Sequence, residues 1–277
     1  MDATRPKDST RPIGVFDSGI GGLTVVRALC ELLPNESIFY LGDTARVPYG
    51  GKSAATVERY SLEISGLLLE ENCKTIVVAC NTASALALPK LEATSPVTVT
   101  GVIQPGAAAA VGTTRNGHIG VIGTRATIKS GAYERAIRAL DDKVQVSGRA
   151  CPLFVPLIEE GWLESEITDR VVRQYLEPLV QDGIDTLVLG CTHYPLLRDA
   201  IGRFLGDTVQ LVDSAQNCAI AVSHLLQAAK LGAPPGSEGT LAVALTDPPD
   251  AFLEVARKSL RLDIGTVQLR EVLHLAK

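Results

Sequence analysis

The feature of the sequence that most restricts its fold is the alternation of short apolar runs with longer amphipathic segments. The runs IGVFDS at residues 13–18 and SIFYLGD at 37–43 predict strands, and each precedes apolar residues at helical spacing, over 24–33 and 54–72. Strands that are apolar along most of their length are typical of parallel sheets, which helices cover on both faces. The alternation therefore predicts an α/β fold built from βαβ units.

The same pattern begins again in the second half of the chain. IGVIGT at residues 119–124 resembles the first run, and TLVLGCTH at 186–193 resembles TIVVACNT at 75–82, in the same order and at nearly equal spacing. This weak repeat predicts two similar, pseudo-symmetric domains, each with a parallel-rich sheet flanked by helices. Further strands are predicted at 97–103, 209–215 and 240–247, and further helices at 83–92 and 251–260.

Composition along the chain gives the expected domain boundaries. A first α/β domain is predicted at residues 13–103 plus 212–277, and a second at 104–211, because Gly, Ala and Pro near residue 105 mark a crossing between them. The first domain is then discontinuous. Residues 1–12 are polar, contain two prolines and lack the apolar core of a secretory signal. They predict a disordered extension on a cytoplasmic protein.

The overall composition argues against several classes of protein. With 46% hydrophobic and 21% charged residues, the chain has the composition of an ordinary globular protein. The net charge is -5, Lys and Arg are scattered, and aromatics make up only 4%. A nucleic-acid partner is not expected, because it needs concentrated positive charge or stacking surfaces. No apolar run approaches the ~18 residues of a membrane span, so no membrane association is expected.

Polar residues follow several predicted strands at the point where each strand ends. Asp17 and Ser18 follow the first strand, and Cys80 and Cys191 follow two others, each with hydrogen-bonding residues directly after it. In doubly wound sheets, ligands bind outside these carboxyl ends. We therefore expect the active site in the cleft between the two domains, with the two cysteines entering it from opposite sides.

The six cysteines differ in their sequence surroundings. They are widely spread and contain no CxxC pair, and disulfides are not expected in a reducing cytosol. A cysteine at a strand end is most often a small buried hydrophobe. This interpretation applies to the four cysteines without a polar cluster: Cys30, Cys73, Cys151 and Cys218. Cys80 and Cys191 are interpreted as functional, because their polar neighbours would be unfavourable in a packed core.

Alternatives for these polar residues stay open. His193 and Cys191 could bind a metal, but the four histidines are spread out, and a thiol that exchanges a proton with a histidine fits better. Asp17 could equally cap the helix after it. The glycines at 19–22 match a dinucleotide loop only loosely, since Thr24 stands at the third glycine position. They fit a small anion such as a carboxylate better.

The pairing of the two cysteines narrows the chemistry. A nucleophilic hydrolase needs one thiol, and a dithiol redox site needs two adjacent sulfurs. Inversion at a carbon needs one group that removes a proton from one face and another that delivers a proton to the opposite face. Two thiols on equivalent loops of two similar domains therefore predict a two-base stereoinversion.

Four sequence segments carry a resemblance to a known family. GVFDSGIGGLTVV (14–26), YLGDTARVPYG (40–50), VVACNTASA (77–85) and LGCTHYPLL (189–197) resemble the signature segments of the glutamate racemases, within the aspartate/glutamate racemase superfamily. The resemblance implies interconversion of L-glutamate and D-glutamate without cofactor or metal. It also implies a role in supplying D-glutamate for peptidoglycan, a cytoplasmic location and a homodimer.

The resemblance implies roles for individual residues. Cys80 and Cys191 would be the catalytic acid/base pair, assisted by Asp17 and His193 respectively, with Glu159 as a further carboxylate near the second cysteine. Substrate would be bound by the following residues: Asp17, Ser18, Tyr49, Gly50, Asn81, Thr82, Thr124, Thr192 and His193. The alternatives are a racemase of another small acidic amino acid, such as aspartate, and a non-catalytic relative that binds a small acid.

Overall fold

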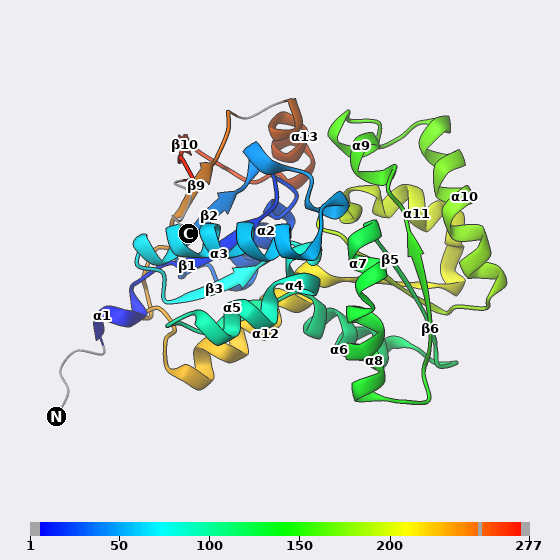
Figure 1. The fold of residues 1–277 in the computed structure, drawn as a ribbon, viewed down its shortest axis with the longest axis horizontal. Coiled ribbons are helices and arrows are strands. Elements are labelled where there is room, and N and C mark those ends of the chain that lie inside the picture. The colour runs from blue at the N-terminus through cyan, green and yellow to red at the C-terminus, as the bar shows by residue number, and fades with distance from the viewer. Residues whose placement is uncertain (1–5, 249–250, 273–277) are drawn as a thin grey trace.

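The computed structural model describes residues 6–248 and 251–272, which contain two sheets (Figure 1). The first sheet has the order β10-β9-β2-β1-β3-β4, and the second has the order β6-β5-β7-β8. All the strand pairs are parallel. The strands are β1 (Ile13–Asp17), β2 (Ile38–Gly42), β3 (Thr75–Val78), β4 (Val99–Gly101), β5 (His118–Gly123), β6 (Gln145–Ala150), β7 (Thr186–Gly190), β8 (Gln210–Asp213), β9 (Leu241–Leu245) and β10 (Val267–Leu269).

The two sheets share one arrangement of four strands. The order β2-β1-β3-β4 in the first sheet corresponds to β6-β5-β7-β8 in the second, so β1 matches β5 and β3 matches β7. These four strands carry the repeated sequence segments. The predicted fold class, two similar α/β halves with parallel sheets flanked by helices, is confirmed.

Helices connect successive strands and flank both sheets (Figure 1). Within the described part of the chain, no helix has the length and hydropathy of a membrane span. The helices are α1 (Pro6–Ser9), α2 (Leu23–Leu32), α3 (Ala54–Glu70), α4 (Asn81–Leu86), α5 (Leu88–Thr94), α6 (Ile103–Thr113), α7 (Arg125–Ser130), α8 (Ala132–Leu140), α9 (Phe154–Glu159), α10 (Glu166–Gln181), α11 (Arg198–Leu205), α12 (Ser214–Ala229) and α13 (Ala251–Leu260), with short 3-10 turns at η1 (Thr44–Arg46), η2 (Tyr49–Gly51), η3 (Tyr194–Leu197) and η4 (Gly206–Thr208).

Among the elements that differ from the sequence expectation, three have a clear cause. The helix predicted at 83–92 is two helices, α4 and α5, because Pro89 lacks an amide proton and is accommodated in the first turn of α5. Strand β6 was not predicted, since its sequence QVSGRA is polar and the strand lies exposed at a sheet edge. Strand β10 was also missed, and it is a three-residue edge strand.

The N-terminal extension was expected to be disordered over residues 1–12, and the structure differs from this expectation at its inner end. Pro6–Ser9 form α1, and the Arg11 side chain donates from Nε to Asn72 O at 2.7 Å and from Nη2 to Cys73 O at 2.9 Å. Lys74 Nζ donates to Ser9 O at 2.8 Å. These hydrogen bonds hold the segment against the start of β3, which its polar composition did not reveal. Residues 1–5 lie outside the described residues.

The chain crosses between the two halves twice. It leaves the first sheet after β4 through α6, and it returns after β8 through α12, which packs on both α2 and α6. Strands β9 and β10 then pair in the first sheet. The domain boundaries at residues 103/104 and 211/212 stay a prediction, and β8 keeps pairing in the second sheet as far as Asp213.

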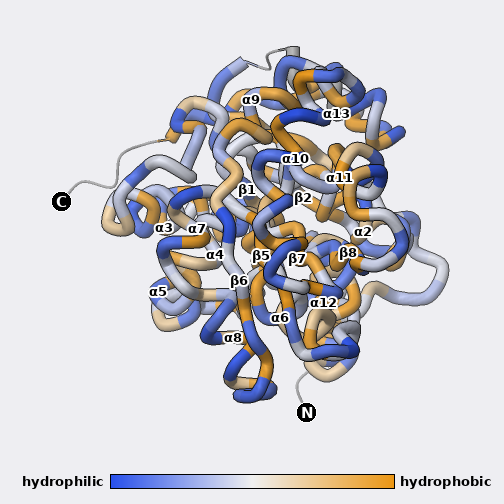
Figure 2. Tube along the Cα trace, turned by 90° about the vertical axis from the view of Figure 1, so that its right-hand side faces the viewer, coloured by the Kyte–Doolittle hydropathy of each residue, from blue (hydrophilic) through white to orange (hydrophobic). Residues whose placement is uncertain are grey.

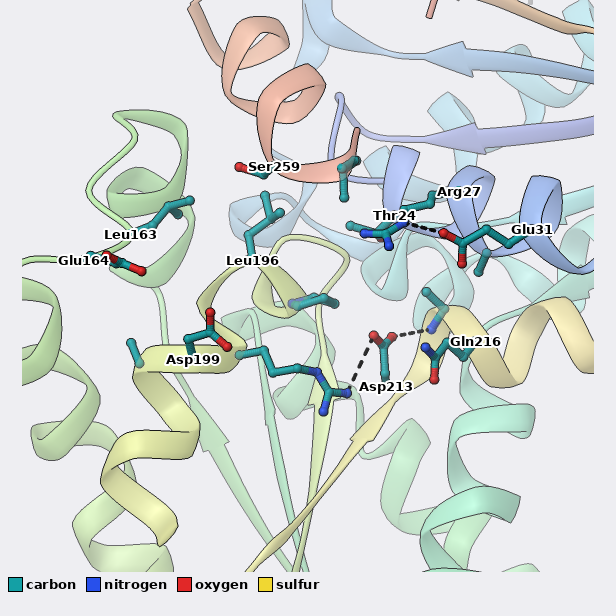
Figure 3. Close-up of a pocket in the computed structure, with 16 residues that line it drawn as sticks. Thr24, Arg27, Glu31, Leu163, Glu164, Leu196, Asp199, Asp213, Gln216 and Ser259 are labelled. Carbon is teal, nitrogen blue, oxygen red and sulfur yellow. Dashed lines mark hydrogen bonds and ion pairs between the residues drawn. The ribbon is translucent and has the colours of Figure 1, made fainter. Parts of the chain in front are cut away.

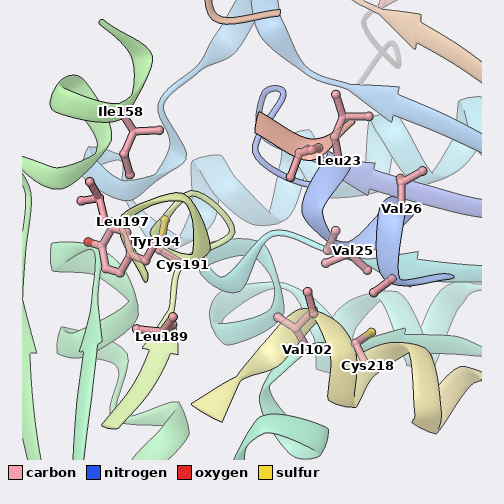
Figure 4. Close-up of a cluster of buried hydrophobic side chains, with 14 of the residues drawn as sticks. Leu23, Val25, Val26, Val102, Ile158, Leu189, Cys191, Tyr194, Leu197 and Cys218 are labelled. Carbon is pink, nitrogen blue, oxygen red and sulfur yellow. The ribbon is translucent and has the colours of Figure 1, made fainter. Parts of the chain in front are cut away.

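One hydrophobic core runs through both halves. It includes Leu23, Val25 and Val26 of α2 as well as Leu189 of β7 and Tyr194, which begins η3 (Figure 4). Along the chain trace, hydrophobic segments gather in the interior around β5, β7 and α6, and hydrophilic segments lie outside them (Figure 2). The continuous core aligns the carboxyl ends of the two sheets toward each other.

Candidate active site

A small cavity of about 30 Å³ lies where the strand ends of the two halves meet. The loops after β1 and β3 enter it from the first half, and the loops after β5 and β7 enter it from the second. It is lined by Ser18, Val47, Pro48, Tyr49, Gly50, Cys80, Asn81, Thr82, Thr124, Val155, Cys191, Thr192 and His193. The structure thus brings together most of the residues predicted from the sequence, while Asp17 and Glu159 stand behind the lining.

The two predicted cysteines take equivalent places in the two halves. Cys80 follows β3 and is the N-cap residue of α4, and Cys191 follows β7 directly. Both are buried free thiols that line the cavity. The cavity therefore has a thiol from each half in its wall.

Cys80 is placed as a proton donor. Its Sγ donates to Ser18 Oγ at 3.5 Å. Burial raises the pKa of the Cys80 thiol, the charge of Asp17 raises it further, and the contact with Ser18 only partly opposes these effects, so that the pKa reaches about 12. At neutral pH this thiol holds its proton.

Cys191 stands at the end of a chain of polar contacts. Its Sγ lies 3.8 Å from His193 Nδ1, and His193 Nε2 lies 3.2 Å from Glu159 Oε1. Burial by itself would lower the pKa of His193, but the contacts with Cys191 and Glu159, together with the charge of Asp17, raise it to about 10. The imidazole therefore carries a proton at neutral pH that it can share with Cys191.

Asp17 is fully buried at the end of β1. Its Oδ2 accepts from the backbone N–H of Gly19 at 3.0 Å, and its Oδ1 accepts from Thr192 Oγ1 at 3.4 Å. The N-cap of α2 is Gly22, so Asp17 is not that helix's cap residue. Burial raises the pKa of Asp17, while the charge of His193 lowers it. Its hydrogen bond to Thr192 joins it to the second half, and its charge also acts on Cys80, the cysteine that the family resemblance assigns to it.

Polar side chains from both halves meet beside Cys80. Asn81 Oδ1 accepts from Tyr133 Oη at 2.7 Å, and Asn81 Nδ2 is buried without a hydrogen-bond partner among the described residues. Thr82 Oγ1 lies 2.9 Å from Thr124 Oγ1 and 3.2 Å from Thr127 Oγ1. The unpaired amide offers two donor protons to a ligand in the cavity, because Asn81 lines it.

A loop after β2 closes one side of the cavity. Tyr49 Oη hydrogen-bonds Asp43 Oδ2, which also accepts from Arg46 Nε at 2.8 Å. Thr246 Oγ1, just after β9, donates to Asp43 Oδ1 at 3.0 Å. Asp43 thereby ties the loop that carries Tyr49 to the first sheet. Sequence reasoning singled out the YLGDTARVPYG segment but not the role of its aspartate.

Glycines permit the closest approach between the halves. A Cβ built on Gly21 would lie 2.4 Å from His193 Nδ1, and one built on Gly50 would lie 2.7 Å from Thr124 Cβ. Neither distance is possible for a real side chain, so each backbone rests directly against a residue of the other half. These contacts keep the cavity small and buried.

The residues that sequence reasoning missed fall into two kinds. Val47, Pro48 and Val155 add apolar surface to the cavity wall, and the first two lie inside a segment that the family resemblance had already marked. Thr127 and Tyr133 contribute through contacts between distant parts of the chain, for which no local sequence signal exists.

A metal site was an open alternative for Cys191 and His193. Among the residues that the structure describes, no group of three or more His, Cys, Asp or Glu side chains is arranged to hold a metal ion. The neighbours of this pair are instead Glu159, Thr192 and the first-half loop at Gly21.

A larger hollow of about 440 Å³ lies nearby and includes neither cysteine (Figure 3). Arg27 and Glu31 of α2 form an ion pair on its wall, and Asp213 accepts from the backbone N–H of Ala215. Thr24, also on its wall, donates from Oγ1 to Thr192 O at 3.1 Å. This hollow is thus separated from the cavity by the residues around Thr192.

The sequence model of the Asp/Glu/hydantoin racemase family matches residues 13–222. The chain is 50% identical to a glutamate racemase of Geobacter metallireducens over 257 residues. This alignment covers 93% of this chain and 95% of that protein.

Solved structures resemble the whole fold. A glutamate racemase isoform from Bacillus anthracis superposes with a TM-score of 0.91 at 39% identity, covering 95% of this chain and 98% of the other. A glutamate racemase from Francisella tularensis, solved in complex with D-glutamate, superposes with a TM-score of 0.89 at 36% identity, with the same coverage of 95% and 98%.

Proposed function

Because this chain belongs to the Asp/Glu/hydantoin racemase family, we propose that it interconverts L-glutamate and D-glutamate, with Cys80 and Cys191 as the two acid/base groups. The family resemblance predicted from the four sequence segments is confirmed. The observation that carries the mechanism is the pair of buried thiols, which occupy equivalent loops of the two halves and line one cavity.

In the proposed reaction, one cysteine thiolate removes the α-proton of bound glutamate from one face. The electron pair of the broken C–H bond stays on Cα, and the thiol on the opposite face delivers its own proton to that carbon. The first sulfur ends as a thiol and the second as a thiolate, and Cα is inverted. The reverse direction uses the same two groups with their roles exchanged.

Positioned donors would stabilise the charge that develops on the substrate. The Asn81 amide and the hydroxyls of Thr82, Thr124 and Thr192 reach the cavity wall, and Ser18 lines it beside Cys80. A well-placed donor in a water-poor site contributes about 3–4 kcal/mol to a charged transition state. Several of them are needed here, since the α-proton of an amino acid is a very weak acid.

The protons in the site are distributed unevenly. Cys80, with a pKa of about 12, supplies the proton on its side by itself. On the other side, His193, with a pKa of about 10, shares a proton with Cys191, and Glu159 holds the imidazole in place. Asp17 would act on both sides, since its charge affects Cys80 and His193 while it accepts a hydrogen bond from Thr192.

The cavity has to enlarge when substrate binds. Its volume is about 30 Å³, whereas sites that hold small molecules commonly measure ~300–1,000 Å³. Because the two halves meet at Gly21 and Gly50, movement of one half away from the other would open it. Closure around glutamate would then exclude water from the reacting carbon.

The product suggests the biological setting. D-glutamate from this reaction would supply peptidoglycan synthesis, in the cytoplasm, and the protein would act as a homodimer. A racemase of aspartate is the second candidate, because the two amino acids carry the same groups around Cα and differ by one methylene.

A circular-dichroism assay of purified protein tests the proposed function. L-glutamate, supplied with no added cofactor, should lose its signal as it approaches the racemic mixture, and L-aspartate measured in parallel should not. In D2O, each product enantiomer should carry solvent deuterium at Cα. An unchanged L-glutamate signal would refute the activity, whereas faster loss of the L-aspartate signal would reassign the substrate.

A further inference from the structure

Tyr133 contacts the site without lining the cavity. We propose that Tyr133 is a positioning residue for racemisation, whose hydroxyl turns the Asn81 side-chain amide so that its NH2 group faces the cavity. This inference rests on the proposed function, in which Asn81 binds the substrate.

The hydrogen bond fixes the direction of the amide. Tyr133 Oη donates to Asn81 Oδ1 at 2.7 Å, and both residues are almost fully buried, at 3% and 2% exposure. Burial raises the pKa of the Tyr133 phenol, so the hydroxyl keeps its proton and stays a donor. With this proton directed at Asn81 Oδ1, the NH2 group of the amide lies on the side away from Tyr133.

The NH2 group of Asn81 lacks a protein partner. Asn81 Nδ2 is buried and makes no hydrogen bond within the described residues. Buried donors of this kind are rare, because leaving them unpaired is unfavourable. Asn81 lines the cavity next to Cys80, so an oxygen of bound substrate is the acceptor that this donor fits.

Tyr133 itself packs against glycine backbone, and one of these contacts is next to the Cys191 loop. A Cβ built on Gly106 would lie 3.3 Å from its Cε1, and one built on Gly190 would lie 3.1 Å from its Cε2. Gly190 directly precedes Cys191, while Asn81 directly follows Cys80. The ring therefore packs beside the Cys191 loop, while its hydroxyl reaches the residue that follows Cys80.

The hydrogen bond also joins the two halves. Asn81 begins α4 after the first-sheet strand β3, and Tyr133 lies on α8 after the second-sheet strand β5. If the halves separate to admit substrate, Asn81 loses this partner, and closure restores it. The amide is therefore oriented when the site closes.

The test compares Tyr133→Phe with the matched control Tyr175→Phe. Tyr175 is on α10 in the same half, and its hydroxyl accepts from the backbone N–H of Leu153 without lining the cavity. For Tyr133→Phe we expect the KM for glutamate to rise about tenfold with kcat within threefold, because a binding group has lost its orientation. Tyr175→Phe should keep both constants within twofold.

The same substitution in an Asn81→Ala background separates positioning from packing. If Tyr133 acts through Asn81, Tyr133→Phe should raise KM no further there. An equal rise in both backgrounds, or no rise in the first, overturns the proposal. Should Tyr133→Phe not fold in a circular-dichroism melt, Asn81→Asp keeps an acceptor for Tyr133 and removes the NH2 group, and an unchanged KM in that variant overturns the proposal.

A ligand-free measurement keeps this proposal apart from the proposed function. In the NMR spectrum, the Asn81 side-chain NH2 protons should give one sharp pair in the unsubstituted protein and a broadened or doubled pair in Tyr133→Phe. An unchanged pair refutes the positioning role even if glutamate is racemised. Lack of racemisation by the unsubstituted protein, with the pair altered as expected, refutes only the proposed function.

Discussion

The two cysteine loops occupy equivalent positions in the two halves, yet their surroundings differ. Cys80 contacts a hydroxyl, Ser18 Oγ, whereas Cys191 contacts an imidazole, His193 Nδ1. Burial and the charge of Asp17 raise the pKa of Cys80 to about 12, and His193 keeps a proton beside Cys191 up to a pH of about 10. The two halves therefore place their cysteines in equivalent backbone positions but in different protonation environments. The strand order determines where each sulfur lies, and the neighbouring side chains determine how its proton is held.

The difference between the two cysteine loops should not appear in kcat/KM. The two enantiomers of glutamate have equal free energies, so kcat/KM must be the same in both directions whatever the site looks like. An asymmetry between the loops can appear in kcat and KM taken separately, and in isotope effects for each enantiomer. Four predictions use the difference between the loops.

The largest effect is expected for the sulfurs themselves. Cys80→Ser and Cys191→Ser should each lower racemisation by about 10³-fold or more, because a hydroxyl ionises far less readily than a thiol and so provides almost no anionic base at neutral pH. The circular-dichroism assay measures the loss in both directions. Cys30→Ser, at a half-buried cysteine outside the cavity, should stay within twofold. Full activity in either cavity variant would contradict the two-base mechanism.

The next largest effect is expected for His193, the protonated imidazole beside Cys191. His193→Asn should lower kcat by about 100-fold, as expected when a general acid/base group is removed. With substrate deuterated at Cα, its isotope effect should grow for one enantiomer only, the one that Cys191 deprotonates. His118→Asn, at the opposite end of β5, is the control. An isotope effect that increases equally for both enantiomers would mean that His193 exchanges protons with both cysteines.

A smaller effect is expected in stability as a function of pH. The pKa of His193 is raised from 6.5 to about 10 in the folded protein, so its contribution to stability is fully present below pH 6.5 and is lost as pH rises through about 10. The difference in melting temperature between the unsubstituted protein and His193→Asn should therefore shrink over this range, by a few degrees. The exposed His224→Asn variant should show no such trend. A constant difference from pH 6.5 to 10 would contradict the raised pKa.

The smallest effect is expected at Ser18. Ser18→Ala removes one hydrogen bond to Cys80, worth about 1 kcal/mol, so kcat should fall roughly fivefold. Its deuterium isotope effect should grow for the enantiomer opposite to the one affected by His193→Asn. Ser147→Ala, on the exposed edge strand β6, provides the control. Growth for the same enantiomer in both variants would break the assignment of one loop to each face.

The sequence predicted those parts of the site that depend on local order along the chain. The residues that follow a strand lie at the carboxyl edge of the sheet, so the repeated segments alone place Cys80 and Cys191 at that edge. Contacts between segments far apart in the sequence were not predictable in this way. Tyr133 reaches Asn81, and Asp17 reaches Thr192, only because the halves close on each other. Strand β6 was not predicted, because a polar edge strand has no run of apolar residues that would indicate it.

Glu159 shows which predictions need the family resemblance and cannot be made from the local sequence alone. Nothing in the segment PLIEEG distinguishes it from the adjacent Glu160, and only the family resemblance favoured it. In the structure Glu159 Oε1 lies 3.2 Å from His193 Nε2. The choice between two neighbouring carboxylates depends on the helical phase at the end of α9, which composition does not encode.

The backbone contact at Gly21 has a consequence for solvent. An added methyl group there would lie 2.4 Å from His193 Nδ1, so the halves could close only after the imidazole had shifted. Because Gly21 has no side chain, the two halves can approach closely enough here to keep bulk water away from the proposed reacting carbon. In a chain with alanine at this position, water would compete with the thiols for the carbanion and could protonate it from either face. In the proposed mechanism the product would still be a mixture of enantiomers, but part of its new protons would come from water instead of from the thiols.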